Sequence, residues 1–92
     1  MNIQLPDLAG RRVLLVEDES LIIMLLEDAL EDLGCEIAAV ASRFDDAIAK
    51  ASALDFDVAI LDVNLSGLRT FPIAEIIRGR GIAFMFATGY GA

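Results

Sequence analysis

Acidic side chains follow two short apolar runs of the sequence and could together bind a divalent cation. An acidic triplet that begins at Glu17 ends the first run, and Asp62 ends the other, with Asn64 two positions later. Two carboxylates about 4 Å apart repel by on the order of 4 kcal/mol at an effective dielectric of about 20, so such a group takes up a proton or a cation. Carboxylate and carbonyl oxygens suit Mg²⁺, and a metal there would let one carboxylate attack a phosphoryl group.

A hydroxyl donor follows a third apolar run. Thr88 comes directly after residues 82–87, and Gly89 follows it. The threonine hydroxyl could donate a hydrogen bond to a phosphoryl oxygen, and glycine leaves room for that group. The chemistry indicated by these residue types is therefore phosphoryl transfer to a carboxylate.

Apolar patterning predicts the elements that would position these side chains. Short runs rich in valine, leucine, isoleucine and alanine are typical of buried parallel strands, and apolar residues at spacings of three and four are typical of helices. The predicted strands are residues 12–17, 36–41, 57–61 and 82–87. The predicted helices are residues 19–33, residues 44–54, and a third that begins at Thr70 and ends near Gly79 or Gly81. This alternation predicts an α/β fold with a parallel sheet and helices on both faces.

The predicted topology places the candidate residues at one edge of the sheet. Ligands of open parallel sheets bind outside the carboxyl ends of the strands. If the first and third strands are neighbours, Glu17, Asp18 and Asp62 share a crevice. Between the third strand and third helix we expect a loop at residues 64–67, with Thr70 capping that helix.

Length and composition limit the possible functions. The chain has 92 residues, enough for one domain, and a net charge of −8 without a basic stripe, so we expect no direct nucleic-acid binding. It has no histidine, which excludes histidine-based acid–base chemistry, and Cys35 is its single cysteine. No apolar run could span a bilayer, and residues 1–10 lack the features of a signal peptide. We expect a leader at residues 1–10, a domain at 11–92, no membrane association and a cytoplasmic location.

Three motifs, each at the end of a predicted strand, give the sequence a family resemblance. They are Val16-Glu17-Asp18, Leu61-Asp62-Val63-Asn64 and Ala87-Thr88-Gly89. In this order they resemble the receiver domain of bacterial response regulators, the CheY-like family, over residues 11–92. The resemblance implies a flavodoxin-like, doubly wound parallel sheet with strand order 2-1-3-4.

The resemblance also implies a role for each residue. Asp62 would accept a phosphoryl group from a histidine kinase or a histidine phosphotransfer protein of a two-component system. Asp18, Asp62 and the main-chain carbonyl of Asn64 would ligate Mg²⁺, and Glu17 would contact the metal mostly through water. Thr88 would hydrogen-bond the phosphoryl oxygen and move inward, which starts the switch.

The sequence departs from the family in two places. Ser66 stands where many receivers have a proline, and we expect this change to affect loop stiffness only. The chain also ends before the family's fifth strand–helix unit, whose strand begins with a lysine; Lys50, the sole lysine, lies on the second helix and cannot replace it. Without that unit, the first helix and the strand at 82–87 would expose apolar surface. We therefore expect either a homodimer through one of them or a fragment whose remainder is disordered or cut off.

Two other functions remain open from the sequence. A pseudo-receiver would keep the fold as a protein-interaction module without using phosphate, which the absent lysine favours and the intact acid set opposes. A haloacid-dehalogenase-like phosphatase is suggested by the run from Asp62 to Ser66, but that family has a second aspartate where Asn64 stands. We expect a signalling domain rather than an enzyme in its own right.

Overall fold

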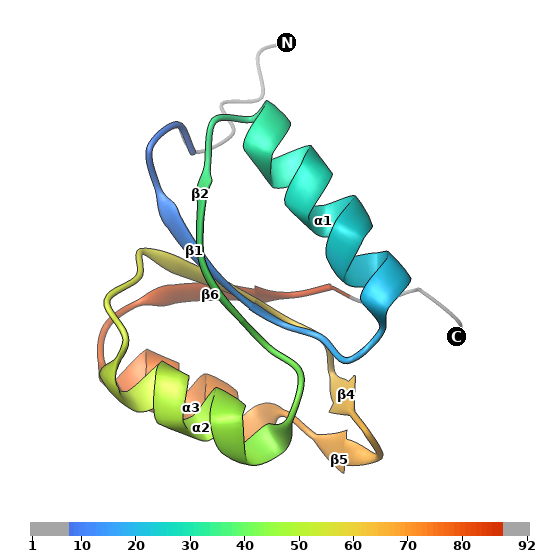
Figure 1. Cartoon of the computed structure of the whole chain (residues 1–92). Coiled ribbons are helices and arrows are strands. Elements are labelled where there is room, and N and C mark those ends of the chain that lie inside the picture. Colours follow the sequence, from blue (N-terminus) through green and yellow to red (C-terminus); the bar gives the residue numbers. More distant parts are fainter. Residues whose placement is uncertain (1–7, 88–92) are drawn as a thin grey trace, which may run out of the picture.

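Strands and helices alternate along the chain in the computed structural model, which describes residues 8–87 (Figure 1). The main elements are β1 (Arg12–Val16), α1 (Ser20–Asp32), β2 (Glu36–Ala41), α2 (Phe44–Ala53), β3 (Val58–Leu61), α3 (Phe71–Gly79) and β6 (Ala83–Phe86). Two further strands, β4 (Asn64–Leu65) and β5 (Leu68–Arg69), lie between β3 and α3. The predicted α/β fold is confirmed.

The four main strands form one parallel sheet in the order β2-β1-β3-β6. This is the predicted order 2-1-3-4, with β6 as its fourth strand. Val16 pairs with Ala41 on one side and with Leu61 on the other. Because β1 and β3 end at the same level, the residues that follow them meet at one edge of the sheet.

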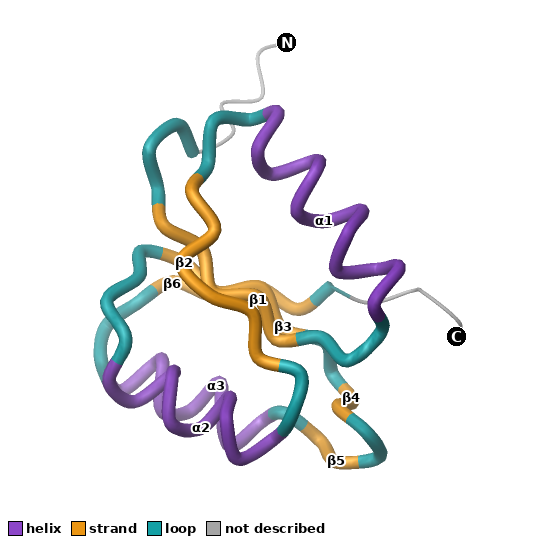
Figure 2. The backbone as a smooth tube through the Cα atoms, in the orientation of Figure 1, coloured by secondary structure: helices purple, strands orange, loops and turns teal. Residues whose placement is uncertain are grey.

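Helices cover both faces of the sheet. Figure 2 shows α1 on one face and the pair α2 and α3 on the other. Successive residues of a strand point to opposite faces. Accordingly, Val13 and Leu15 pack in the cluster that contains Leu30 of α1, whereas Leu14 and Val16 pack in the larger cluster beneath α2 and α3.

A two-residue hairpin replaces the loop predicted at residues 64–67. β4 and β5 pair antiparallel, with Leu65 opposite Leu68. The two residues of the turn both have positive φ, 51° at Ser66 and 86° at Gly67, as a type I′ turn requires. The expectation that Ser66 changes only loop stiffness is therefore too narrow. Proline, with φ fixed near −65°, could not occupy this turn.

Gly34 ends α1 as the sequence predicts. Its φ is 86°, and two backbone bonds complete the helix end: Gly34 donates to Glu31 over 2.9 Å, and Cys35 donates to Leu30 over 2.9 Å. This is the Schellman arrangement, which favours glycine because a Cβ is strained at that φ.

Residues 8–10, which the sequence places in a leader, contact the domain. Gly10 donates its N–H to the carbonyl of Gly34 over 2.8 Å, and the Cys35 thiol contacts the carbonyl of Leu8 over 3.4 Å. Burial raises the pKa of that thiol, as expected for an unreactive core cysteine. None of the helices within residues 8–87 has the length and apolar character needed to cross a membrane.

Candidate functional site

Three carboxylates meet at the carboxyl ends of β1 and β3. One oxygen each from Glu17, Asp18 and Asp62 lies within 4.8 Å of the other two. Glu17 is buried, Asp62 is half-buried and Asp18 is exposed. The structure therefore brings together the three acids that the sequence singled out, at the predicted edge of the sheet.

Glu17 anchors the cluster from within. Its Oε1 accepts the backbone N–H groups of Asp18 and Glu19, each over 3.1 Å. Burial raises the pKa of Glu17, and the nearby charge of Asp62 raises it further, while the two backbone hydrogen bonds act in the opposite direction. The carboxylate form of Glu17 is thus destabilised here, and a cation would relieve that cost.

Hydrogen bonds on both sides fix the backbone of Asp62. Its N–H donates to the carbonyl of Val16 over 2.9 Å. The buried Thr70 hydroxyl contacts the carbonyls of Asp62 and Val63. Thr70 occupies the N-cap position of α3 but makes no side-chain capping bond. The prediction that its side chain caps the helix is therefore wrong, because the hydroxyl is taken up by the carbonyls of the β3–β4 connection.

Asp18 is held by a residue that sequence reasoning did not connect with it. The N–H and the hydroxyl of Ser66 both donate to Asp18 Oδ2, each over 2.9 Å. Ser66 lies 48 positions further along the chain, so neither spacing nor periodicity could indicate the contact. A possible signal was the Ser66-Gly67 pair between two leucines, which is typical of a tight hairpin turn.

Of the two remaining candidate residues, Asn64 and Thr88, the structure describes only Asn64. Asn64 begins β4 and donates its N–H to Asp62 Oδ1 over 3.3 Å, which places it beside the cluster. The role of its main-chain carbonyl as a metal ligand stays a prediction. Thr88 lies outside the described residues.

The donor set suits a hard divalent cation. Within residues 8–87, no lysine or arginine forms an ion pair with any of the three carboxylates, so no basic side chain in this part of the chain compensates their charge. Oxygen donors of this kind, partly open to water, match Mg²⁺ better than metals that prefer nitrogen or sulfur. Lys50 does not contribute, since it is paired with Asp46 on α2.

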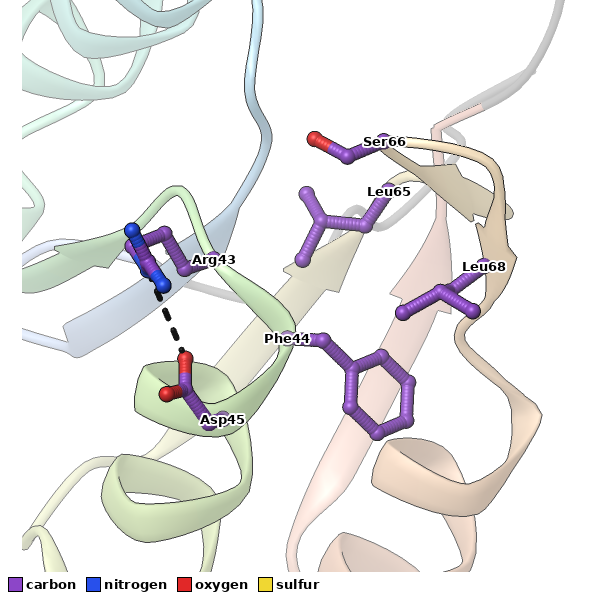
Figure 3. Close-up of a pocket in the computed structure, with 6 residues that line it drawn as sticks. All are labelled: Arg43, Phe44, Asp45, Leu65, Ser66 and Leu68. Carbon is purple, nitrogen blue, oxygen red and sulfur yellow. Dashed lines mark ion pairs between the residues drawn. The ribbon is translucent and has the colours of Figure 1, made fainter.

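A pocket of about 520 Å³ lies beside the hairpin (Figure 3). It is lined by Arg43, Phe44, Asp45, Leu65, Ser66 and Leu68. Leu65 and Leu68 point toward the side of Phe44, whereas the Ser66 side chain points away from that ring. Arg43 is paired with Asp45 over 3.6 Å. Ser66 thus lines this pocket and also donates two hydrogen bonds to Asp18 of the acidic cluster.

Comparison with known proteins identifies the family. The model of the response regulator receiver domain matches residues 13–92. The chain belongs to this family. As a receiver domain it is a signalling module, and its sheet order is that of the CheY-like receivers.

Solved structures and a curated relative agree with this assignment. SdrG from Sphingomonas melonis Fr1 is 42% identical, with a TM-score of 0.80 over 89% of this chain and 70% of that one; a structure described as its BeF3-activated conformation is 44% identical, with a TM-score of 0.73 over 88% and 70%. The response regulator PhyR from Brucella abortus is 29% identical, with a TM-score of 0.77. Ethylene receptor 2 of Arabidopsis thaliana is 35% identical over 86 residues.

The receiver domain corresponds to only part of some of these proteins. The match to PhyR covers 85% of this chain but 33% of the PhyR chain. The match to the ethylene receptor covers 88% of this chain but 11% of the receptor. The likeness to these two proteins therefore extends to one part of each and not to their whole activities.

Proposed function

We propose that this receiver domain takes a phosphoryl group onto Asp62 from a phosphohistidine of a histidine kinase or a histidine phosphotransfer protein. The observation that carries the proposal is the cluster of Glu17, Asp18 and Asp62, whose oxygens lie within 4.8 Å of one another. Such a cluster at a topological switch point favours a cation and a charged substrate rather than a purely structural role.

Asp62 is the member best placed to act as nucleophile. It is half-buried at the carboxyl end of β3, whereas Glu17 is buried and Asp18 is exposed. Its backbone is fixed through Val16 and Thr70, so the carboxylate is presented from a rigid base. A fixed nucleophile loses little entropy when it meets its substrate.

The transfer exchanges one bond for another. A carboxylate oxygen of Asp62 attacks phosphorus, the phosphorus–nitrogen bond to the donor imidazole breaks, and an aspartyl phosphate forms while the imidazole nitrogen takes a proton from water. Asp18, Asp62 and the Asn64 carbonyl would hold Mg²⁺, with Glu17 contacting it mostly through water. Bound there, Mg²⁺ would neutralise charge on the phosphoryl oxygens. Thr88 would donate its hydroxyl to one of those oxygens.

A beryllofluoride titration tests the proposal, because beryllofluoride mimics an aspartyl-bound phosphoryl group; the relative SdrG has a structure described as BeF3-activated. We expect saturable changes in the amide NMR spectrum around Asp62 when beryllofluoride is added with Mg²⁺, and none when EDTA replaces Mg²⁺. Asp62→Asn should abolish the changes. Asp28→Asn, a matched change on the exposed side of α1, should leave them intact.

The opposite outcome favours the pseudo-receiver. If the wild-type chain is folded and shows no change with beryllofluoride and Mg²⁺, Asp62 is not a phosphoacceptor. If Asp62→Asn responds like the wild type, the adduct forms elsewhere.

A further inference from the structure

Ser66 links the hairpin to the acidic cluster through two hydrogen bonds to one carboxylate oxygen of Asp18. Its N–H and its hydroxyl both donate to Asp18 Oδ2, each over 2.9 Å. Both donors come from one residue and converge on one acceptor, so they fix the position of the carboxylate and not merely its proximity.

The hairpin is built to present these two donors. Leu65, the residue before Ser66, is fully buried in the core beneath α2 and α3, which anchors the strand. Ser66 itself has a φ of 51°, a backbone conformation that residues other than glycine, asparagine and aspartate rarely adopt. In Figure 3 its side chain is turned away from Phe44. A strained residue persists where surrounding contacts compensate for it, and the bonds to Asp18 are such contacts.

Asp18 needs this support because of its neighbours. It is the exposed member of the cluster, so water alone would allow its side chain to rotate. Glu17 and Asp62 lie within 4.8 Å, and repulsion from their charges favours rotation away from the site. Two donors on Oδ2 oppose that rotation, while Oδ1 accepts no hydrogen bond from residues 8–87 and keeps its lone pairs for a metal.

We infer that Ser66 is a positioning residue for the metal: it holds Asp18 beside two like charges in the orientation that Mg²⁺ requires. The inference rests on the proposed function, since it assumes that Asp18 is a metal ligand. It further states that this chain uses a serine in a type I′ turn for the purpose, a solution that a proline at position 66 would exclude, because proline has no N–H and cannot adopt the positive φ.

The test is the Mg²⁺ affinity of Ser66→Gly. Glycine keeps the backbone donor and accepts a positive φ without strain, so the hairpin should persist while the hydroxyl donor is lost. Loss of a hydrogen bond that orients a metal ligand costs about 10-fold or more in affinity. We expect the dissociation constant for Mg²⁺, from a ¹H–¹⁵N NMR titration with MgCl₂, to rise about 10-fold, with amide shifts outside the hairpin unchanged and no loss of stability in EDTA.

Two further variants make the outcome specific. Ser52→Ala removes a serine hydroxyl that donates to Ile48 on α2, away from the acids, and should leave Mg²⁺ affinity as in the wild type. Asp18→Asn should weaken binding more than Ser66→Gly, because it removes the ligand itself.

The results distinguish a failure of the inference about Ser66 from a failure of the proposed function. If the wild type and Ser66→Gly bind Mg²⁺ equally, or the variant binds more tightly, Ser66 does not position Asp18, and the proposed function stands without it. If Asp18→Asn binds as tightly as the wild type, Asp18 is not a ligand and the inference fails. If the folded wild type binds no Mg²⁺, the proposed function and the inference fail together.

Discussion

Glu17 shows how a buried carboxylate can be kept at this site. Only 5% of it is exposed, and burial raises its pKa from the ordinary value of 4.5, with Asp62 adding to the effect. The N–H groups of Asp18 and Glu19 compensate in part. Stability in the absence of metal should therefore depend on the protonation of Glu17.

We expect Glu17→Gln to change the pH dependence of stability in EDTA. A carboxyl whose pKa is higher in the folded state binds its proton more tightly there, so its contribution to stability is present below pH 4.5 and is lost as pH rises through the folded pKa. Glutamine keeps an acceptor for the two N–H groups and does not ionise. In urea unfolding at several pH values, the free energy of unfolding of the variant should rise relative to that of the wild type as pH rises above 4.5.

A pH-independent difference between the two proteins would show that burial of the Glu17 charge is not the cause. Saturating Mg²⁺ provides the control. It should reduce the advantage of the variant at neutral pH, because the cation stabilises the carboxylate that glutamine lacks.

At the scale of single residues the sequence predicted the acids but not their supports. Glu17, Asp18 and Asp62 were predictable because each follows an apolar run, and strand ends are where ligands bind. The contacts of Ser66 and Thr70 were not. They depend on one positive φ and on hydrogen bonds to carbonyls and carboxylates that only the folded backbone brings near.

The elements were predictable where their patterns were long. α1 and the parallel strands follow clear apolar periodicities, and Gly34 marks a helix end by its chemistry. The hairpin was missed because β4 and β5 have two residues each, too few to show alternation. Its turn uses serine in a position where asparagine or glycine is the usual signal.

Two glycine substitutions test the ends of the helices. Gly34→Ala should destabilise the domain by about 1–2 kcal/mol, because φ there is 86° and a Cβ would lie 3.3 Å from the Ala9 Cα. Gly79→Ala is the matched control: it ends α3 without a positive φ, and nothing lies within 4 Å of its added Cβ. Alanine should stabilise that helix by up to about 1 kcal/mol.

Urea unfolding of both variants measures the contrast. Equal effects of the two substitutions would contradict the left-handed conformation assigned to Gly34. A stabilising Gly34→Ala would contradict the close approach of residue 9 as well.

At the scale of the whole molecule, exposed apolar side chains occur on several elements, and three of them lie within one turn of α1. Leu21, Met24 and Leu25 of α1 are 66%, 59% and 53% exposed, and Met85 of β6 is 54% exposed. The three on α1 are three and four positions apart, so they lie on one side of the helix. Contiguous apolar surface of this kind favours association.

We expect this chain to form a homodimer through α1. Light scattering after size-exclusion chromatography should give a mass that rises toward twice that of the monomer as concentration increases. Replacing Leu21 and Leu25 together by glutamine should return the mass to that of the monomer. Leu68→Gln, at a site on the hairpin that is 52% exposed, should not. A monomer at every concentration would rule out association. If only Leu68→Gln reduced the mass to that of the monomer, the contact between the two copies would lie at the hairpin and not at α1.

The overall architecture was the most predictable level. Four apolar runs alternating with helices require parallel pairing, and the family resemblance supplied the order that the structure then showed. What periodicity alone could not supply was which strands are neighbours. That adjacency is what places Asp62 beside Glu17 and Asp18.

Phosphorylation of Asp62 is the central claim, and mass spectrometry of the intact protein tests it most directly. The chain would be incubated with acetyl phosphate, a small phosphodonor, in Mg²⁺ or in EDTA, and the modified residue would then be located by peptide mapping. We expect one phosphoryl group per chain, only with Mg²⁺, carried by Asp62 and absent from Asp62→Asn. A folded wild-type protein that gains no phosphoryl group, or gains it equally in Asp62→Asn, would contradict the claim.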